Sequence, residues 1–168
     1  DVQIPGSVAC TVGGLPSFCG VISNAGKARL QGFEAEGKLT LGALTLAGSL
    51  GYIDAKYRQY ITNIASTPTD VAANRKVQNT PAWSGNVSAT YTAALAGGTL
   101  AVSGGASFKS TTYQFEIANP FLDQRAYALL DASAVYHAPG RHWSIGLYGK
   151  NLADKRYRTS GYSFVAAN

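Results

Sequence analysis

The chain has 168 residues, which fits one domain, but only 14% of them are charged, against about 25% in an ordinary soluble domain. No run of about 18 apolar residues occurs, so the sequence excludes a transmembrane helix. The net charge of +5 is scattered, with no basic cluster longer than two residues, which argues against a nucleic-acid-binding protein. Two classes remain: a soluble all-β protein and a transmembrane β-barrel.

The two cysteines bracket the sequence TVGGLPSF near the start of the chain. Cysteine-type metal sites usually need four ligands, and the other ligands are missing here, so no metal site is expected. We predict a disulfide between Cys10 and Cys19, within a loop that contains Gly and Pro, and therefore an oxidising compartment. Two free thiols in a flexible loop are the alternative.

Strand patterns recur along the chain, and their connections are unequal in length. Tight turns are predicted near Gly42, at 96–98 and at 138–141, while a long polar segment at 61–81 and a medium loop at 117–125 separate other strands. In an up-and-down meander, this order puts the tight turns at one end and the longer loops at the other, as in outer-membrane barrels. The segments are also longer than the five or six residues typical of soluble strands. The predicted strands are 25–40, 43–60, 82–95, 99–116, 126–137 and 142–162.

The predicted strands alternate apolar and polar residues, so each has one face of either kind. Trp83 and Tyr91 share an apolar face eight residues apart, which corresponds to a height of about 20 Å in a tilted strand. That spacing matches an apolar band between two aromatic girdles. The sequence therefore predicts a lipid-facing girdle of Trp83, Tyr91, Tyr136 and Trp143. The opposite face, directed into the barrel lumen, is predicted to carry Glu34, Glu36, Lys38, Lys109 and Asp131.

Several segments resemble the C-terminal barrel region of TonB-dependent outer-membrane receptors. They are GFEAEGKLTLGALTLAGSLGYIDAKY, YALLDASAVYH and, most specifically, WSIGLYGKNLADKRYRTSGY. The resemblance implies a barrel of 22 strands closed by a plug domain, driven by an inner-membrane energy-coupling complex and importing scarce nutrients. Because the chain stops at SFVAAN without a terminal aromatic residue, we expect residues 1–168 to be a C-terminal barrel segment without the plug domain and the final strand. The expected fold is all-β: an antiparallel, up-and-down transmembrane β-barrel, present as a partial barrel of six to seven long strands.

Two groups of polar residues could be catalytic, but a polar barrel lumen also explains them. Asp131, His142 and Ser144 resemble a catalytic triad only in composition, because Ser144 lacks the strand-to-helix turn that such a nucleophile needs. Glu34 and Glu36 suggest an acid–base pair, but the adjacent Lys38 favours a charge-balanced wall that contacts the plug. We therefore predict no catalytic residues, no cofactor and no enzyme activity.

Aromatic and basic residues near the expected extracellular loops are predicted to bind the ligand by stacking or clamping. An alternative is that each of them belongs to the outer aromatic girdle or packs the loops together. The candidate residues are Tyr57, Tyr60, Tyr113, Phe115, Phe121 and Arg125.

The predicted function is that of a barrel wall in an active importer of an iron chelate, a vitamin or an oligosaccharide, located in the bacterial outer membrane. The expected partners are outer-membrane lipid, the remainder of the barrel with its plug, and the energy-coupling complex acting through the plug. A scaffold barrel in a larger assembly, a small self-contained barrel and a soluble β-sandwich are the alternatives.

Overall fold

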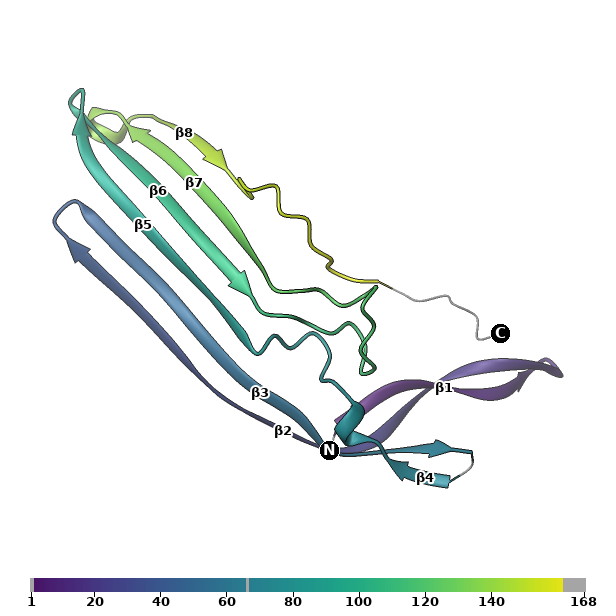
Figure 1. The fold of residues 1–168 in the computed structure, drawn as a ribbon. Helices are drawn as coiled ribbons and strands as arrows, with labels where there is room; N and C mark the ends of the chain where they lie inside the picture. The colour runs from purple at the N-terminus through teal and green to yellow at the C-terminus, as the bar shows by residue number, and fades with distance from the viewer. Residues whose placement is uncertain (1, 66, 162–168) are drawn as a thin grey trace.

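The computed structural model describes residues 2–65 and 67–161, and these form one curved antiparallel sheet (Figure 1). Seven strands follow one another in the order β1-β2-β3-β5-β6-β7-β8, and the short strand β4 pairs with the end of β3. The all-β, antiparallel, up-and-down fold of a partial barrel is therefore confirmed. The strands are β1 (Val2–Val12), β2 (Leu15–Leu41), β3 (Leu44–Ile64), β4 (Thr67–Asp70), β5 (Trp83–Leu95), β6 (Gly98–Lys109), β7 (Tyr127–His137) and β8 (Ser144–Gly149).

Short turns join β2 to β3 and β5 to β6, and the 3-10 turn η2 (Pro139–Arg141) lies between β7 and β8. These connections share one end of the sheet, which we term the turn end (upper left in Figure 1). The β5–β6 turn needs positive φ at both central residues, and Ala96 (48°) and Gly97 (76°) supply it. The connections 67–82 and 110–126 lie at the opposite end, which we term the loop end (Figure 1). It also holds the 3-10 turn η1 (Ala72–Asn74).

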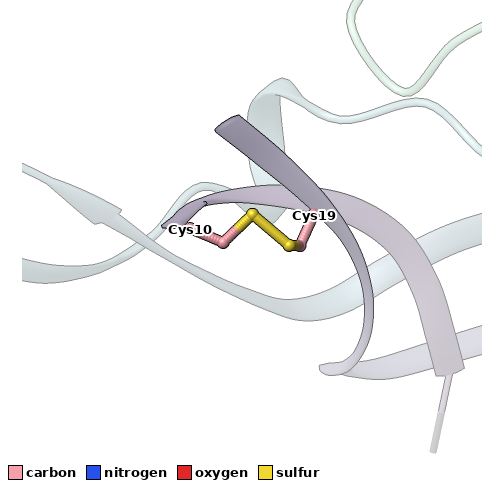
Figure 2. Close-up of a disulfide and its surroundings, with 2 residues drawn as sticks. All are labelled: Cys10 and Cys19. Atoms are coloured by element: carbon pink, nitrogen blue, oxygen red, sulfur yellow. A yellow bond between two sulfur atoms is a disulfide. The ribbon is translucent and has the colours of Figure 1, made fainter. Parts of the chain in front are cut away.

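The cysteine-containing segment differs from the prediction, because it is a β-hairpin and not a loop. β1 pairs with the first part of β2 across Gly13 and Gly14, both with positive φ (61° and 80°). The strand predicted over 25–40 therefore begins ten residues earlier, at Leu15. Figure 2 shows the disulfide that joins Cys10 on β1 to Cys19 on β2, with their Cα atoms 5.8 Å apart.

Two predicted strands end earlier in the structure than the alternation indicated. The segment 99–116 leaves the sheet after Lys109. Beyond it, the Ser110 backbone N–H still donates to the Trp83 carbonyl (2.8 Å), and a bridge pairs Thr112 with Gln124. The segment 142–162 is strand only over Ser144–Gly149, within the described part. Asn151 (φ 50°) and Asp154 (φ 45°) then turn the chain, because their short polar side chains tolerate the left-handed conformation.

Register places the residues of the central sheet on two chemically distinct faces. Directly paired residues share a face, and the face alternates at each step along a strand. The apolar face carries Phe33, Tyr52 and Trp83 in one row, and Leu41, Leu44, Tyr91, Val102, Ala134 and Leu147 in another. The polar face carries Glu34, Ser84 and Lys109 in one row, and Thr40, Thr45, Thr90, Ser103 and Ser133 in another. Leu129, Val135 and Tyr148 are apolar exceptions on the polar face.

Nothing in the described chain covers the apolar face. Among the described residues, Tyr60 and Ala138 are the hydrophobic residues that are buried, and neither lies in the middle of the sheet. Val87 and Leu147, by contrast, are 59% and 76% exposed. The sheet therefore has no packed core of its own, and its apolar face needs an apolar medium or a partner.

No helix within the described ranges is both long and apolar enough to cross a bilayer.

Candidate ligand-binding cavities at the loop end

A cavity of about 510 Å³ lies where β3, the β3–β5 connection and the β6–β7 loop meet. We term it the loop-end cavity. Its wall includes Tyr57 from β3, Arg75 and Lys76 from the connection, and Tyr113 from the β6–β7 loop. Asp54 and Lys56 of β3 also line it, so the cavity combines phenol rings with three basic residues and one carboxylate.

Tyr60 fixes the β3 side of this region. Its ring meets the ring of Tyr57 edge-on, with the centroids 5.1 Å apart, and packs against Val71 and Ala72. The Arg75 guanidinium lies 5.4 Å from the centroid of the Tyr60 ring, within the range of a cation–π contact. Burial, followed by the charge of Glu116, raises the pKa of both Tyr57 and Tyr60, so both phenols stay protonated at neutral pH.

Asp70 holds the β3–β5 connection against β3. Its Oδ1 accepts hydrogen bonds from the backbone N–H groups of Tyr60 and Ala72, both 3.0 Å long. These two hydrogen bonds lower the pKa of Asp70, because they favour the charged carboxylate. The connection that carries Arg75 is therefore anchored just before the cavity wall.

Hydrogen bonds join the β3–β5 connection to the β6–β7 loop across the cavity. The backbone N–H of Lys76 donates to the carbonyl of Glu116 (2.7 Å), and that of Asn79 donates to the carbonyl of Tyr113 (2.9 Å). The Gln78 amide also donates to the Glu116 carboxylate (2.7 Å), and the Lys76 ammonium lies 5.4 Å from the Tyr113 ring centroid. The two loops therefore form one wall.

The six predicted ligand-binding residues are only partly brought together. Tyr57, Tyr60 and Tyr113 gather at or beside the loop-end cavity. Phe115 is half-buried in the adjoining loop and is not part of the lining, whereas Phe121 is 83% exposed. Arg125 lies apart from them, in a second cavity.

The second cavity, of about 500 Å³, is strongly basic. Arg125, Lys155, Arg156 and Arg158 line it together with Asp123. The buried Gln124 side chain accepts a hydrogen bond from the Arg158 backbone N–H (2.6 Å) and so ties the two segments together.

The sequence analysis missed the basic residues of both cavities. Arg75 and Lys76 are adjacent within a long polar segment, and Lys155, Arg156 and Arg158 fall within a predicted strand. In the sequence, these residues could have been found only from the adjacent basic pairs Arg75–Lys76 and Lys155–Arg156.

The predicted lumen-facing residues lie on the polar face. Glu34 and Glu36 border a shallow cavity of about 560 Å³ with Ser49, Ser84 and Asn86. Lys38 borders a neighbouring cavity, and Lys109 pairs with Ser84 in the row of Glu34. The two ion pairs among the described residues both involve Asp54, so Glu34, Glu36 and Lys38 are not paired with one another in that part of the chain.

Aromatic residues lie on the apolar face at two heights. Trp83 packs against Phe33 and Tyr52, with ring centroids 5.9 and 4.6 Å away, near the loop end. Tyr91 lies eight residues further along β5, and Tyr136 contacts Trp143 (5.6 Å between centroids) at the turn end. Phe33 and Tyr52 are members of the group near the loop end that the sequence analysis did not single out.

The triad considered in the sequence, Asp131, His142 and Ser144, is not assembled in the described structure. Asp131 accepts a hydrogen bond from the Asn151 backbone N–H (2.8 Å), while Ser144 pairs with His137, six residues along β7 from Asp131. That separation is about 20 Å along a strand, so Asp131 and Ser144 do not meet. The described ranges also contain no group of three or more His, Cys, Asp or Glu side chains arranged to hold a metal ion.

Comparison with known proteins identifies the barrel. No solved structure matches the chain. Residues 2–152 match the family model described as "TonB dependent receptor-like, beta-barrel". Members of that family are transporters of the bacterial outer membrane, and a plug and an interaction with TonB are general features of the family. Because the match covers most of the 168 residues, the chain belongs to the TonB-dependent receptor β-barrel family.

Proposed function

We propose that this chain forms part of the barrel wall of an outer-membrane receptor that imports a scarce nutrient by active transport. The observation that carries the proposal is the uncovered apolar face with aromatic residues at two heights. Trp83 and Tyr91 are eight residues apart on β5, which corresponds to about 21 Å of height at a strand tilt of about 40°. Outer-membrane barrels have an apolar band about 25 Å tall between their aromatic girdles, so the two dimensions agree.

The free edges of the sheet support a place within a larger barrel. Among the described residues, no strand pairs with the edge of β2 opposite β3 over residues 27–41, or with the outer edge of β8. Unpaired backbone groups are costly in lipid, each by several kcal/mol, so a membrane sheet must close on itself. We propose that residues 1–168 are a C-terminal segment of the barrel domain and that further strands of the same receptor pair with these edges.

The polar face is the proposed contact surface for the plug. Glu34 and Glu36 border its shallow cavity with carboxylates that form no ion pair among the described residues, and Lys38 and Lys109 lie on the same face. Long charged side chains that lack local partners are suited to ion pairs with a domain inside the barrel. The inner-membrane energy-coupling complex would then act on this wall through the plug.

The loop-end cavity is the proposed contact of the chain with its substrate. Phenol rings and the cations Arg75 and Lys76 suit a solute with flat or hydroxylated parts and negative charge. We propose that the substrate is an iron chelate, a vitamin or an oligosaccharide. No catalytic role is assigned.

Uptake measurements on cells that depend on the complete receptor test this function. Labelled ferric chelate, cobalamin and oligosaccharide are supplied separately, with the receptor gene present or deleted. We expect uptake of one class to require the receptor, and to stop when the energy-coupling complex is deleted. Receptor-dependent uptake that continues without the complex would refute active import, and a receptor absent from the outer-membrane fraction would refute the membrane assignment.

A further inference from the structure

The loop-end cavity and the second cavity share one loop. The first arm of the β6–β7 loop supplies Tyr113 to the loop-end cavity, and its second arm supplies Gln124 and Arg125 to the second cavity. Backbone hydrogen bonds in both directions between Thr112 and Gln124 (2.9 and 3.0 Å) hold the two arms together. Paired backbones of this kind are about 4.8 Å apart. The two cavities are therefore neighbours on either arm of one narrow loop.

Both cavities include residues on the polar face of the sheet. The bridge between Thr112 and Gln124 keeps the register of β6 with β7, which places Arg125 on the same face as Tyr127. The Tyr157 ring stacks on that of Tyr127, with the centroids 4.7 Å apart and the planes 9° apart, so it lies on this face as well. Tyr57 of the loop-end cavity occupies the polar face of β3. A solute inside the barrel can therefore reach both cavities from one side.

The cations of the second cavity form no ion pair within the described ranges, where both ion pairs involve Asp54. These cations are Arg125, Lys155, Arg156 and Arg158. Asp123, which also lines the cavity, accepts hydrogen bonds from the backbone N–H groups of Asn119 (2.8 Å) and Gln114 (3.4 Å) and so holds the loop. Four basic residues against this one carboxylate leave a formal excess of three positive charges.

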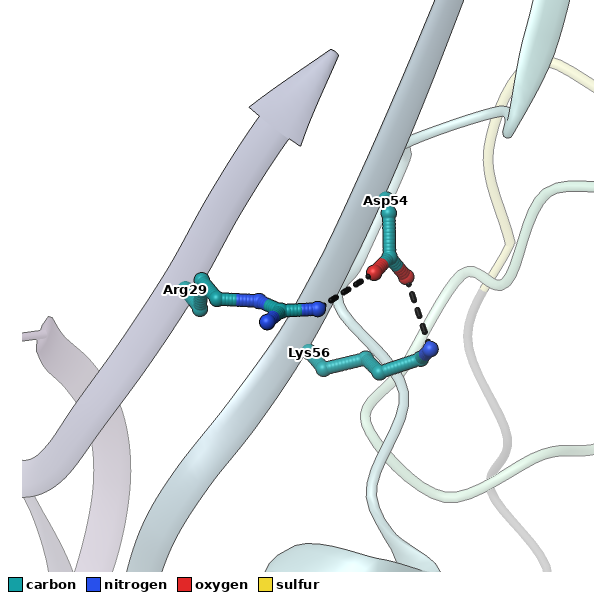
Figure 3. Close-up of polar contacts among 3 residues, drawn as sticks. All are labelled: Arg29, Asp54 and Lys56. Carbon is teal, nitrogen blue, oxygen red and sulfur yellow. Dashed lines mark hydrogen bonds and ion pairs between the residues drawn. The ribbon is translucent and has the colours of Figure 1, made fainter.

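The loop-end cavity is also basic, because its carboxylate is already paired. One oxygen of Asp54 lies 2.8 Å from an Arg29 guanidinium nitrogen, and the other lies 2.9 Å from the Lys56 ammonium (Figure 3). The Asp54 side chain is only 14% exposed, so it presents little negative charge to an incoming anion. Glu116, beside the cavity, accepts a hydrogen bond from the Gln78 amide. The two cations of the β3–β5 connection remain available in the cavity wall.

We propose that the two cavities are neighbouring subsites for one elongated acidic oligosaccharide, which is the substrate of the receptor. This inference rests on the proposed import function and narrows its three substrate classes to one. A compact ferric chelate is accommodated by a single cavity of about 500 Å³ and leaves the cations of the other unused. A vitamin without negative charge uses the cations of neither. A chain with a carboxylate on each successive sugar crosses the loop and forms charge-assisted hydrogen bonds in both.

The linings favour an acidic sugar chain over a single-stranded nucleic acid, the other elongated polyanion. Hydroxyl side chains in the loop-end cavity can exchange hydrogen bonds with sugar hydroxyls. They belong to Thr80, Ser110 and Thr111. Single-stranded nucleic acids are bound by aromatic rings on which successive bases stack. Here one face of Tyr157 is taken by Tyr127, and the Lys76 ammonium lies 5.4 Å from the centroid of the Tyr113 ring.

The test measures binding to the complete receptor, purified in mild detergent, by isothermal titration calorimetry. The probes are galacturonate and mannuronate chains, each as a trimer and an octamer, with an uncharged glucose octamer for comparison. R75Q/K76Q removes cations from the loop-end cavity, and R125Q/R156Q removes them from the second cavity. The matched control is K27Q/R58Q, because both residues are exposed at the loop end and line neither cavity. Folding of each variant is checked by the heat-dependent shift in gel mobility, and R125K/R156K keeps the charge of the second cavity.

We expect one uronate octamer to bind about tenfold or more tightly than its trimer, because a ligand held in one subsite meets the other at a high effective concentration. R75Q/K76Q and R125Q/R156Q should each weaken octamer binding by about tenfold, back toward the affinity of the trimer. R125K/R156K should retain most of the affinity, and K27Q/R58Q should stay within twofold of the unaltered receptor.

Three results would overturn the inference. They are equal affinities for octamer and trimer, octamer binding that is unchanged in either glutamine variant of the cavities, and equal binding of the uncharged octamer. Tighter binding of an oligothymidylate with the same number of charges would also overturn it, in favour of a nucleic-acid site.

The same measurements separate this inference from the proposed function. A receptor that imports a ferric chelate or a vitamin, yet binds neither uronate octamer, refutes only the acidic oligosaccharide. A receptor that binds the octamer through both cavities but supports no energy-dependent uptake refutes the import function and leaves the binding site in place.

Discussion

Substitution of Val87 directly tests whether the apolar face of the sheet contacts lipid. It lies on the apolar face, four residues from Trp83 and four from Tyr91 along β5. At a tilt of about 40°, each aromatic height is therefore about 10 Å away, which puts Val87 at the middle of the apolar band. Its side chain is 59% exposed and is covered by nothing in the described chain.

The perturbation is Val87→Arg, compared with Ser88→Arg one residue further along the same strand. An arginine at the bilayer midplane on the lipid face of a barrel costs about 2–4 kcal/mol of stability, whereas lumen positions tolerate polar substitutions. Ser88 is on the polar face, in the row of Lys38 and Asp131. We expect Val87→Arg to lower the free energy of folding into lipid by about 2–4 kcal/mol and Ser88→Arg by less than about 1 kcal/mol.

Reversible folding of the complete receptor into phospholipid vesicles, followed by urea titration, measures both values. Val87 and Ser88 are consecutive residues of β5, so the two variants have nearly the same depth in the membrane. The main difference between them is the face of the sheet that carries the arginine. On the surface of a soluble protein, an exposed valine such as Val87 would tolerate arginine to within about 0.5 kcal/mol. Equal costs for the two variants would therefore contradict the lipid-facing assignment.

Three further predictions concern the loop end. Asp70→Ala should speed amide hydrogen exchange at Tyr60 and Ala72, which donate to Asp70, relative to Thr69→Ala; unchanged exchange would show that Asp70 does not anchor the connection. Reduction of the Cys10–Cys19 disulfide should destabilise the β1–β2 hairpin by about 2–3 kcal/mol, seen as faster proteolysis near Gly13, and no change in cleavage would refute this. The folded state lowers the pKa of Asp54 below its unfolded-state value of 3.8, so its ion pairs should persist from neutral pH down to pH 3.8. They should be lost only as the pH falls through the lowered folded-state pKa, and a carboxyl ¹³C titration with a midpoint above 3.8 would contradict this.

Strand identity and facing were predictable from the sequence because alternation in the central sheet is nearly unbroken. Paired rows such as Glu36 and Ser49, or Leu39 and Leu46, carry the same polarity on neighbouring strands. Strand ends were less predictable. Alternation continues through Tyr113 and Phe115 although the sheet ends at Lys109, since the loop's own hydrogen bonds to the β3–β5 connection replace strand pairing there.

The loop-end cavity was only partly predictable, because it depends on contacts between loops distant in sequence. Aromatic content drew attention to Tyr57 and Tyr113, but periodicity says nothing about which loop lies beside which. Arg75 reaches Tyr60 only because Asp70 anchors the connection against β3, and that anchoring is a tertiary contact. The Cys10–Cys19 hairpin was missed for a related reason: glycine and proline indicate a loop as readily as they indicate a tight β-turn.

The short turns have a consequence for the dimensions of the barrel. Relative to the row through Leu44, Tyr91, Val102 and Ala134, the β2–β3 turn follows immediately, whereas the β5–β6 and β7–β8 turns come four residues later. When these turns share one level at the membrane surface, the four-residue difference is a total stagger of about 14 Å between the β2–β3 and β7–β8 hairpins. These hairpins are four strand spacings of about 4.8 Å apart, so the strands tilt by about 35° from the barrel axis. That tilt lies within the range of membrane barrels and sets the shear of this stretch of wall. A slip of one residue in the pairing of β2 with β3 would alter the shear and also reverse the facing of every side chain on one of the two strands.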